Sequence, residues 1–133
     1  MREVFADTFY FLALNNPADA AHQRALVYSS NTSTVMITTA WVLAEVGNAL
    51  SGSQDRRRFV ELLRLLETTP TTQVVPANQE DFDQGMKLYR ERTDKEWSVT
   101  DCISFVVMNE RKIAKALTGD RHFEQAGFRA LLR

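Results

Sequence analysis

Cysteine, proline and glycine are scarce in this sequence, and long hydrophobic runs are missing. The 133 residues include one Cys, three Pro and five Gly. A single cysteine excludes an intrachain disulfide and is consistent with a reducing cytoplasm. No stretch is long enough to cross a membrane, and the start "MREVFAD" is too acidic and too short in apolar residues for a signal peptide. We therefore expect a cytoplasmic protein without membrane contact.

An excess of charge of one sign is also lacking. The sequence has 16 basic and 17 acidic residues, so the net charge is −1 and no global positive field favours nucleic acid. The sequence does have 44% hydrophobic residues, which is enough for an ordinary core in a chain of this length. We find no internal repeat, low-complexity tract or linker, and we expect residues 1–133 to form a single domain.

Short apolar runs alternate with amphipathic segments along the chain. Runs that are short or rich in β-branched residues predict strands at 2–7, 33–39, 72–76, 115–117 and 127–133. Apolar residues at helical spacing predict helices at 8–14, 17–28, 40–50, from 56 to about 67, from 78 to about 91, and through 101–108. Strands that alternate with helices indicate an α/β fold with a small, mostly parallel sheet.

Four carboxylates can meet at one edge of such a sheet. Strand C-terminal ends and the N-terminal ends of the following helices share this edge, and ligands bind there. Asp7 ends the first predicted strand, Asp120 follows the strand at 115–117, and Asp101 lies in the first turn of its helix. Glu45 lies in the second turn of its helix, and its side chain leans back toward the same edge.

Each of these acids also has a purely structural interpretation. Asp7 suits a helix N-cap, and the S-x-x-D pattern from Ser98 to Asp101 resembles a capping box. Asp120 suits the turn "TGD", and Glu45 suits a solvated helix position. Capping and metal binding are compatible in one residue, so both interpretations stay open at this point.

Clustered carboxylates need a counter-charge. Without one they repel and raise one another's pKa. A hard divalent cation removes this conflict, and ligands that are all oxygen select Mg²⁺ or Mn²⁺ over zinc. Such a cation bridges to phosphate oxygens, activates water and neutralises charge on a phosphodiester. The four acids therefore predict metal-dependent phosphodiester hydrolysis.

Four motifs resemble those of a known family. They are "FADTFYFLAL", "TTAWVLAEVGNAL", "WSVTDCISFVVM" and "LTGDRHF", and they occur in the order found in PIN-domain ribonucleases. The sequence is similar in particular to the small stand-alone members that serve as VapC-type toxins of type II toxin–antitoxin pairs. This resemblance implies a PIN-like three-layer sandwich with a small, mostly parallel sheet flanked by helices.

The resemblance also implies roles for individual residues. It implies that four acids bind Mg²⁺ or Mn²⁺ and catalyse cleavage of single-stranded or structured RNA. These acids are Asp7, Glu45, Asp101 and Asp120. Ser98 and Thr118 match the small hydroxyl residues that support the acids in this family. The resemblance further implies a homodimer and an antitoxin segment bound on the apolar helices at about 39–67. That apolar surface could equally be part of the core.

One position departs from the family pattern. Many members have a further acid two residues after the final aspartate, whereas this chain has His122. A complete second metal site is therefore not implied. We expect His122 to lie at the surface, and a phosphate contact is the alternative. Asp94 is either an accessory acid or, as we expect, a solvated loop residue.

Other polar and aromatic residues near the motifs have a structural interpretation beside the functional one. The arginines 56–58, together with Lys95 and Arg121, are either solvated charges or phosphate contacts. Trp97 is expected to pack in the core, with base stacking as the alternative if it is exposed. Cys102 is expected to be a small core residue.

Two functions without catalysis are the competing hypotheses. The first is an RNA-binding or scaffold module, and the second is a phosphoacceptor α/β regulatory domain. A phosphoacceptor domain needs paired acids near the first strand and a lysine after the last, and the sequence offers neither. A phosphatase of the D-x-D-x-T kind fails because Asp7 is followed by "TF". The four acids together favour the ribonuclease.

Overall fold

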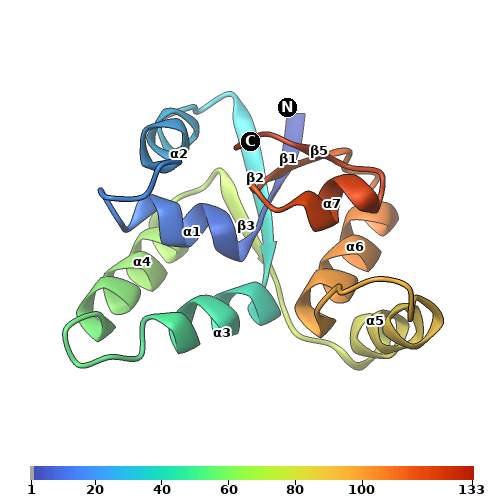
Figure 1. Ribbon diagram of the computed structural model, residues 1–133. Helices are drawn as coiled ribbons and strands as arrows, with labels where there is room; N and C mark the ends of the chain where they lie inside the picture. The colour runs from blue at the N-terminus through green and yellow to red at the C-terminus, as the bar shows by residue number, and fades with distance from the viewer. Residues whose placement is uncertain (1) are drawn as a thin grey trace.

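The computed structural model describes residues 2–133, and these residues form five strands and seven helices (Figure 1). The strands are β1 (Arg2–Ala6), β2 (Thr34–Thr39), β3 (Thr72–Val75), β4 (Lys115–Leu117) and β5 (Arg129–Ala130). The helices are α1 (Thr8–Leu14), α2 (His22–Ser29), α3 (Ala40–Ala49), α4 (Arg56–Thr68), α5 (Gln79–Glu91), α6 (Val99–Arg111) and α7 (Arg121–Gln125). Within residues 2–133, no helix is long and apolar enough to cross a membrane.

The strands form one sheet in the order β3-β2-β1-β4-β5. Each neighbouring pair is parallel, which confirms the predicted α/β fold. The chain builds the sheet outward from β1 to β3 and then returns to the other side of β1 with β4 and β5. The strand order therefore reverses between β1 and β4. In open α/β sheets, this reversal at the C-terminal strand ends is where ligands bind.

Helices cover both faces of the sheet, so the fold has three layers (Figure 1). On one face the Phe5 ring lies 6.4 Å from that of Phe123 in α7, and Phe123 packs edge-on against Phe105 in α6 at 4.9 Å. On the other face, Met36 of β2 shares a small cavity with Phe11 of α1 and with residues of α4. Residues from both layers are buried in one hydrophobic core.

Trp97, just before α6, and Cys102, within α6, pack in the core as predicted. The Trp97 side chain is buried, and its ring lies edge-on to Phe105 with 5.1 Å between centroids. Its indole Nε1–H donates to Gln125 Oε1 at 3.1 Å. Cys102 is fully buried in the core. The alternative of base stacking by Trp97 is therefore wrong for this conformation.

The second helix begins later than predicted. Residues 17–21 form turns, and α2 starts at His22 rather than at Pro17. The Asn16 side chain accepts a hydrogen bond from the Ala18 amide, and the Asp19 side chain accepts one from the Ala21 amide. Such local side-chain bonds compete with the helical ladder and hold the segment in turns.

The C-terminal segment also differs from the prediction. The strand predicted at 127–133 is only Arg129–Ala130, and the short helix α7 was not predicted. With five residues, α7 is too short to show a helical apolar period. Its N-cap is Asp120, whose side chain accepts a hydrogen bond from the His122 amide.

Two of the predicted helices bury only part of their apolar side chains. On α3, Val42 and Val46 are buried but Ala49 is exposed. On α5, the Phe82 and Tyr89 side chains are 38% and 47% exposed. The reason lies in Gly85, which faces α6 so closely that a Cβ there would overlap the Ile103 side chain. Helix α5 therefore docks through its glycine face, and its large side chains point elsewhere.

Candidate active site

Asp7 lies at the C-terminal end of β1, where the strand order reverses. Its side chain is 5% exposed and accepts a hydrogen bond of 2.9 Å from Thr118 Oγ1. Asp7 occupies the N-cap position of α1, yet among the described residues its side chain makes no capping hydrogen bond. Asp7 is therefore the N-cap residue of α1 by position, as the sequence suggests, but it does not cap the helix through its side chain.

Burial makes Asp7 a weaker acid than an exposed aspartate. The pKa of its carboxyl is raised to about 7, mainly because burial removes water from the charged form. The hydrogen bond from Thr118 lowers the pKa, whereas the negative charges of Asp101 and Glu45 raise it further. Three acids from three different elements therefore act on one another at this edge of the sheet.

Asp101 lies in the first turn of α6 and completes a capping box with Ser98. The Asp101 amide donates to Ser98 Oγ at 3.0 Å, and the Ser98 amide donates to Asp101 Oδ2 at 3.1 Å. The predicted capping role is confirmed. Asp101 is nevertheless buried, and burial raises the pKa of its carboxyl. The negative charge of Asp120 also raises this pKa, while the capping bond and His122 lower it.

Thr118 joins the acids of β1 and of the loop after β4. Its hydroxyl donates to Asp7 and accepts a 3.0 Å hydrogen bond from the Asp120 amide. The Asp120 carboxylate accepts from the His122 amide at 2.9 Å and caps α7. Thr118 is fully buried, so this connection is shielded from solvent.

Glu45 lies in the second turn of α3, and it is outside the group formed by Asp101, Asp120 and His122. The helix begins where Thr39 caps it, with the Thr39 side chain accepting from the Val42 amide at 3.1 Å. This start places Glu45, a half-buried residue, near the C-terminal edge of the sheet. Its charge contributes, as the smallest of the causes, to the raised pKa of Asp7.

His122 lies among the acids rather than at the open surface, and the prediction for this residue is wrong. Its Nδ1 atom is 3.2 Å from Asp101 Oδ2 and 3.4 Å from Asp120 Oδ1. Asp101, Asp120 and His122 each offer a ligand atom within 4.8 Å of the others. The spacing Asp-x-His at a helix start was the available signal, because an N-cap and the residue two positions later lie in the same turn.

Several of the other polar residues named from the sequence have partners within the protein. Asp94 forms an exposed ion pair with Arg92, with 2.9 Å between Oδ1 and Nε, and this pairing lowers the Asp94 pKa to about 2. Arg92 also lies over the Trp97 ring at 4.9 Å. Arg56 and Arg58 donate to backbone carbonyls of the loops at Ser51 and Asn15. These contacts account for Asp94 and for two of the three arginines without a ligand.

The donor set at this edge suits a divalent metal ion. Four carboxylates come from β1, α3, α6 and the β4–α7 loop, and two of them have raised pKa values. Next to Asp7, the buried Thr8 Oγ1 has no hydrogen-bond partner among the described residues. Crowded acids and an unpaired hydroxyl are what a hard cation with oxygen ligands and water would satisfy.

Sequence comparison assigns the chain to a family. The family model of the PIN domain matches residues 4–129. This chain belongs to the PIN-domain family. The resemblance in the four sequence motifs is thereby confirmed.

Individual relatives agree with this assignment. The PIN domain is 30% identical over 126 residues to the 23S rRNA-specific endonuclease VapC20 of Mycobacterium tuberculosis, with 94% of this chain and 95% of the relative covered. The crystal structure of that protein, described as a sarcin–ricin loop cleaving toxin, matches with a TM-score of 0.83 at 27% identity, covering 94% and 95% of the two chains.

More distant structures share the fold. VapBC2 from Rickettsia felis, bound to a promoter DNA fragment, matches with a TM-score of 0.69 at 11% identity, covering 96% of each chain. FitAcB from Neisseria gonorrhoeae matches with a TM-score of 0.64 at 16% identity, covering 96% of this chain and 94% of the other. The three-layer architecture of the PIN domain is common to all three structures.

Proposed function

We propose that this PIN domain is a divalent-metal-dependent endoribonuclease and the toxin of a VapBC-type toxin–antitoxin pair. The observation that carries the proposal is the cluster of Asp101, Asp120 and His122 within 4.8 Å, beside the buried Asp7. The similarity to a 23S rRNA-specific endonuclease over 94% of the chain supports RNA as the substrate. A module that only bound RNA would gain nothing from burying acids that repel phosphate.

The proposed metal ligands are Asp7, Glu45, Asp101 and Asp120, and the proposed ion is Mg²⁺ or Mn²⁺. The cation supplies Lewis-acid chemistry, in which it activates water and neutralises charge that develops on the phosphodiester. Thr118 holds Asp7 through its hydroxyl, and Ser98 holds Asp101 through the capping box. His122 fixes the carboxylates of Asp101 and Asp120 relative to each other.

Cleavage of a fluorescent RNA with and without EDTA tests the proposal. We expect activity with Mn²⁺ or Mg²⁺ and none in EDTA. Asp101→Asn should lose most activity while remaining folded, because Asn still caps α6 but carries no charge for the metal. The matched control is Asp94→Asn, which removes an acid seven residues away that is exposed and paired with Arg92. The control should cleave like the wild type.

The same assay can overturn the mechanism. Metal-independent cleavage that disappears in His122→Ala would assign the chemistry to a histidine base and leave Asp101 as a cap only. Equal loss in Asp94→Asn and Asp101→Asn would point to a general charge effect on RNA binding. Ribosomal RNA is the first natural substrate to test, given the relative's activity.

Partners follow from the same proposal. We infer that an antitoxin segment covers apolar residues of α3 and α4, where Leu43, Leu63 and Leu66 line a cavity of about 370 Å³ and Leu65 is 56% exposed. The product of the neighbouring gene should bind the wild type and not Leu63→Glu, because Leu63 lines this cavity. We also propose that the protein forms a homodimer. A monomer mass from light scattering at high protein concentration would exclude this.

A further inference from the structure

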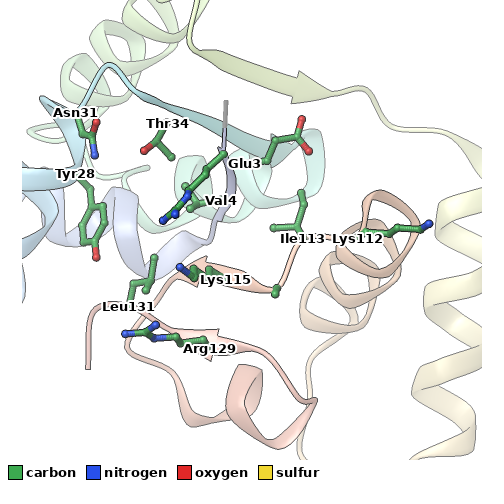
Figure 2. Close-up of a pocket in the computed structure, with 12 residues that line it drawn as sticks. Glu3, Val4, Tyr28, Asn31, Thr34, Lys112, Ile113, Lys115, Arg129 and Leu131 are labelled. Carbon is green, nitrogen blue, oxygen red and sulfur yellow. The ribbon is translucent and has the colours of Figure 1, made fainter.

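A basic pocket lies at the opposite edge of the sheet from the acids. It has a volume of about 580 Å³ and is formed where β1, β4 and β5 begin and where α2 ends. We call the part lined by Arg2, Lys115 and Arg129 the basic trough. Figure 2 shows Lys115 and Arg129 side by side, with Tyr28 and Asn31 across the pocket from them.

Strand register places the three cations of the basic trough on one face of the sheet. Lys115 is directly opposite Arg129 in the β4–β5 pair. Phe5 pairs with Ala116, so Val4 is the neighbour of Lys115, and Arg2 lies two residues before Val4 on the same face. Glu3 alternates to the other face. Figure 2 shows Glu3 and Lys112, which also line the pocket, pointing away from Lys115 and Arg129.

This arrangement leaves positive charge uncompensated. Among residues 2–133, the ion pairs within 4.0 Å do not include any of the three cations. Like charges directly opposite each other on neighbouring strands destabilise a sheet. Lys115 is half-buried as well, which weakens its screening by solvent. An anion seated between these side chains would relieve the repulsion, as a cation does for the acids at the other edge.

The other groups of the pocket suit phosphate oxygens. The Tyr28 and Thr34 hydroxyls and the Asn31 amide can donate hydrogen bonds, and Val4 and Leu131 supply an apolar floor. Neighbouring strands lie about 4.8 Å apart, so Lys115 and Arg129 can contact the same phosphate group. Arg in particular matches phosphate through its planar fork of donors.

The position of the basic trough relative to the acids indicates which phosphate it meets. Arg2 begins β1 and Asp7 follows its end, so about 17 Å of strand separates the two edges. A ligand that reaches both must extend over several nucleotides. The chain has no overall positive charge to attract RNA, and the acids repel it. Local cations away from the acids are therefore needed for affinity.

We propose that the basic trough binds backbone phosphates of a folded RNA, remote from the bond that is cleaved. This inference rests on the proposed ribonuclease function and adds a substrate preference to it. An RNA of two or three nucleotides at the acids does not reach the basic trough. A stem-loop can place one strand at the acids and phosphates of its stem at Lys115 and Arg129. The protein then selects structured RNA through affinity rather than through the chemical step.

Binding of a fluorescent stem-loop RNA in EDTA, followed by anisotropy, tests the inference without relying on catalysis. The test variant is Lys115→Gln/Arg129→Gln, and the matched control is Arg64→Gln/Lys87→Gln, which removes two exposed charges elsewhere. We expect the test variant to bind about 10- to 100-fold more weakly. The slope of log K against log salt should fall by about 1.4–1.8, which corresponds to two lost phosphate contacts. The control should bind like the wild type.

Two further readouts separate the possible outcomes. Thermal melting of the test variant should be unchanged or higher, because a repulsive pair has been removed. Cleavage of a short single-stranded oligonucleotide with Mn²⁺ should be unaffected by the substitutions.

Stem-loop binding equal to that of the wild type would overturn the inference. If the variant loses only the binding of fluorescent AMP, the pocket holds a free nucleotide and the RNA proposal is wrong. If neither the wild type nor the variants cleave RNA but the wild type and the control still bind the stem-loop, the ribonuclease proposal is wrong. The proposal for the basic trough is then unaffected.

Discussion

Asp7 makes the metal-free fold less stable as the pH rises. Its pKa is about 7 when folded and 3.8 when unfolded, so the folded state holds a proton that the unfolded state releases between these values. The unfolding free energy therefore falls as the pH increases from about 4 to 7 and then levels off. Asp7→Asn removes this cost. In EDTA at pH 8, the variant should be more stable than the wild type by about 2–4 kcal/mol, since each pKa unit corresponds to about 1.4 kcal/mol.

Urea unfolding of both proteins at several pH values measures this difference. The asparagine can still accept the hydrogen bond from Thr118, so the comparison isolates the charge. Curves for wild type and variant should coincide near pH 4 and separate above it. Parallel curves from pH 4 to pH 8 would show that the Asp7 carboxyl is not buried as the fold implies.

Single residues of the site differ in how far the sequence predicts them. Asp7 and Asp120 follow short apolar strands, and the topology of a parallel sheet brings such residues together whatever the details of packing. The position of His122 depends instead on α7, a helix too short to leave a periodic pattern. Crowding of the acids predicts a raised pKa from the sequence, but the main cause at Asp7 is burial, which depends on how the whole fold packs around this side chain.

The contact between α5 and α6 depends on one glycine. A Cβ at Gly85 would overlap the Ile103 side chain and lie 3.1 Å from the Ile103 Cα, and the backbone cannot move aside cheaply. Alanine in a helix gains about 1 kcal/mol over glycine. Overpacking costs about 1–3 kcal/mol. We expect the clash to win, so Gly85→Ala should lower the unfolding free energy by about 1–2 kcal/mol.

Gly52→Ala is the control for this element. A Cβ at Gly52 would meet only the Asp55 carboxylate, at an ordinary 3.5 Å, so stability should change by less than about 0.5 kcal/mol. Because α6 carries Asp101 in its first turn, Gly85→Ala should also weaken metal binding, measured by titration calorimetry. A Gly85→Ala protein as stable as the wild type would mean that the helices pack less closely than described.

Elements with long apolar patterns were predictable, and those controlled by local hydrogen bonds were not. The alternation of strands and helices follows from residues such as Val42 and Val46, whose spacing fits one face of α3. The start of α2 does not follow from apolar spacing. Asn16 and Asp19 hold the preceding residues in turns because their side chains accept backbone hydrogen bonds. The spacing of apolar residues indicates which face of a helix packs. It does not indicate where side-chain hydrogen bonds replace the backbone bonds of a helix.

The whole molecule should melt at a higher temperature when its acids hold a cation. Any ligand that binds only the folded state stabilises it by mass action, by about 2.7 kcal/mol at a hundredfold excess over Kd. The melting temperature in millimolar Mn²⁺ or Mg²⁺ should therefore exceed that in EDTA. Asp7→Asn should shrink the difference, whereas Asp94→Asn should leave it unchanged. An identical midpoint with and without saturating metal would contradict a preformed site.

The hydroxyl of Thr118 has only one proton, and that proton is committed to Asp7 Oδ2. Its lone pair is engaged by the Asp120 amide, so the direction of this chain of hydrogen bonds is set. When Asp7 is protonated, we therefore expect its own proton on Oδ1, because Oδ2 already accepts the proton of Thr118. Because the pKa values of Asp7 and Asp101 are both raised, metal binding near neutral pH should release protons into the buffer. The heat of binding should then vary with the ionisation enthalpy of the buffer, so calorimetry in several buffers counts the protons that the acids release.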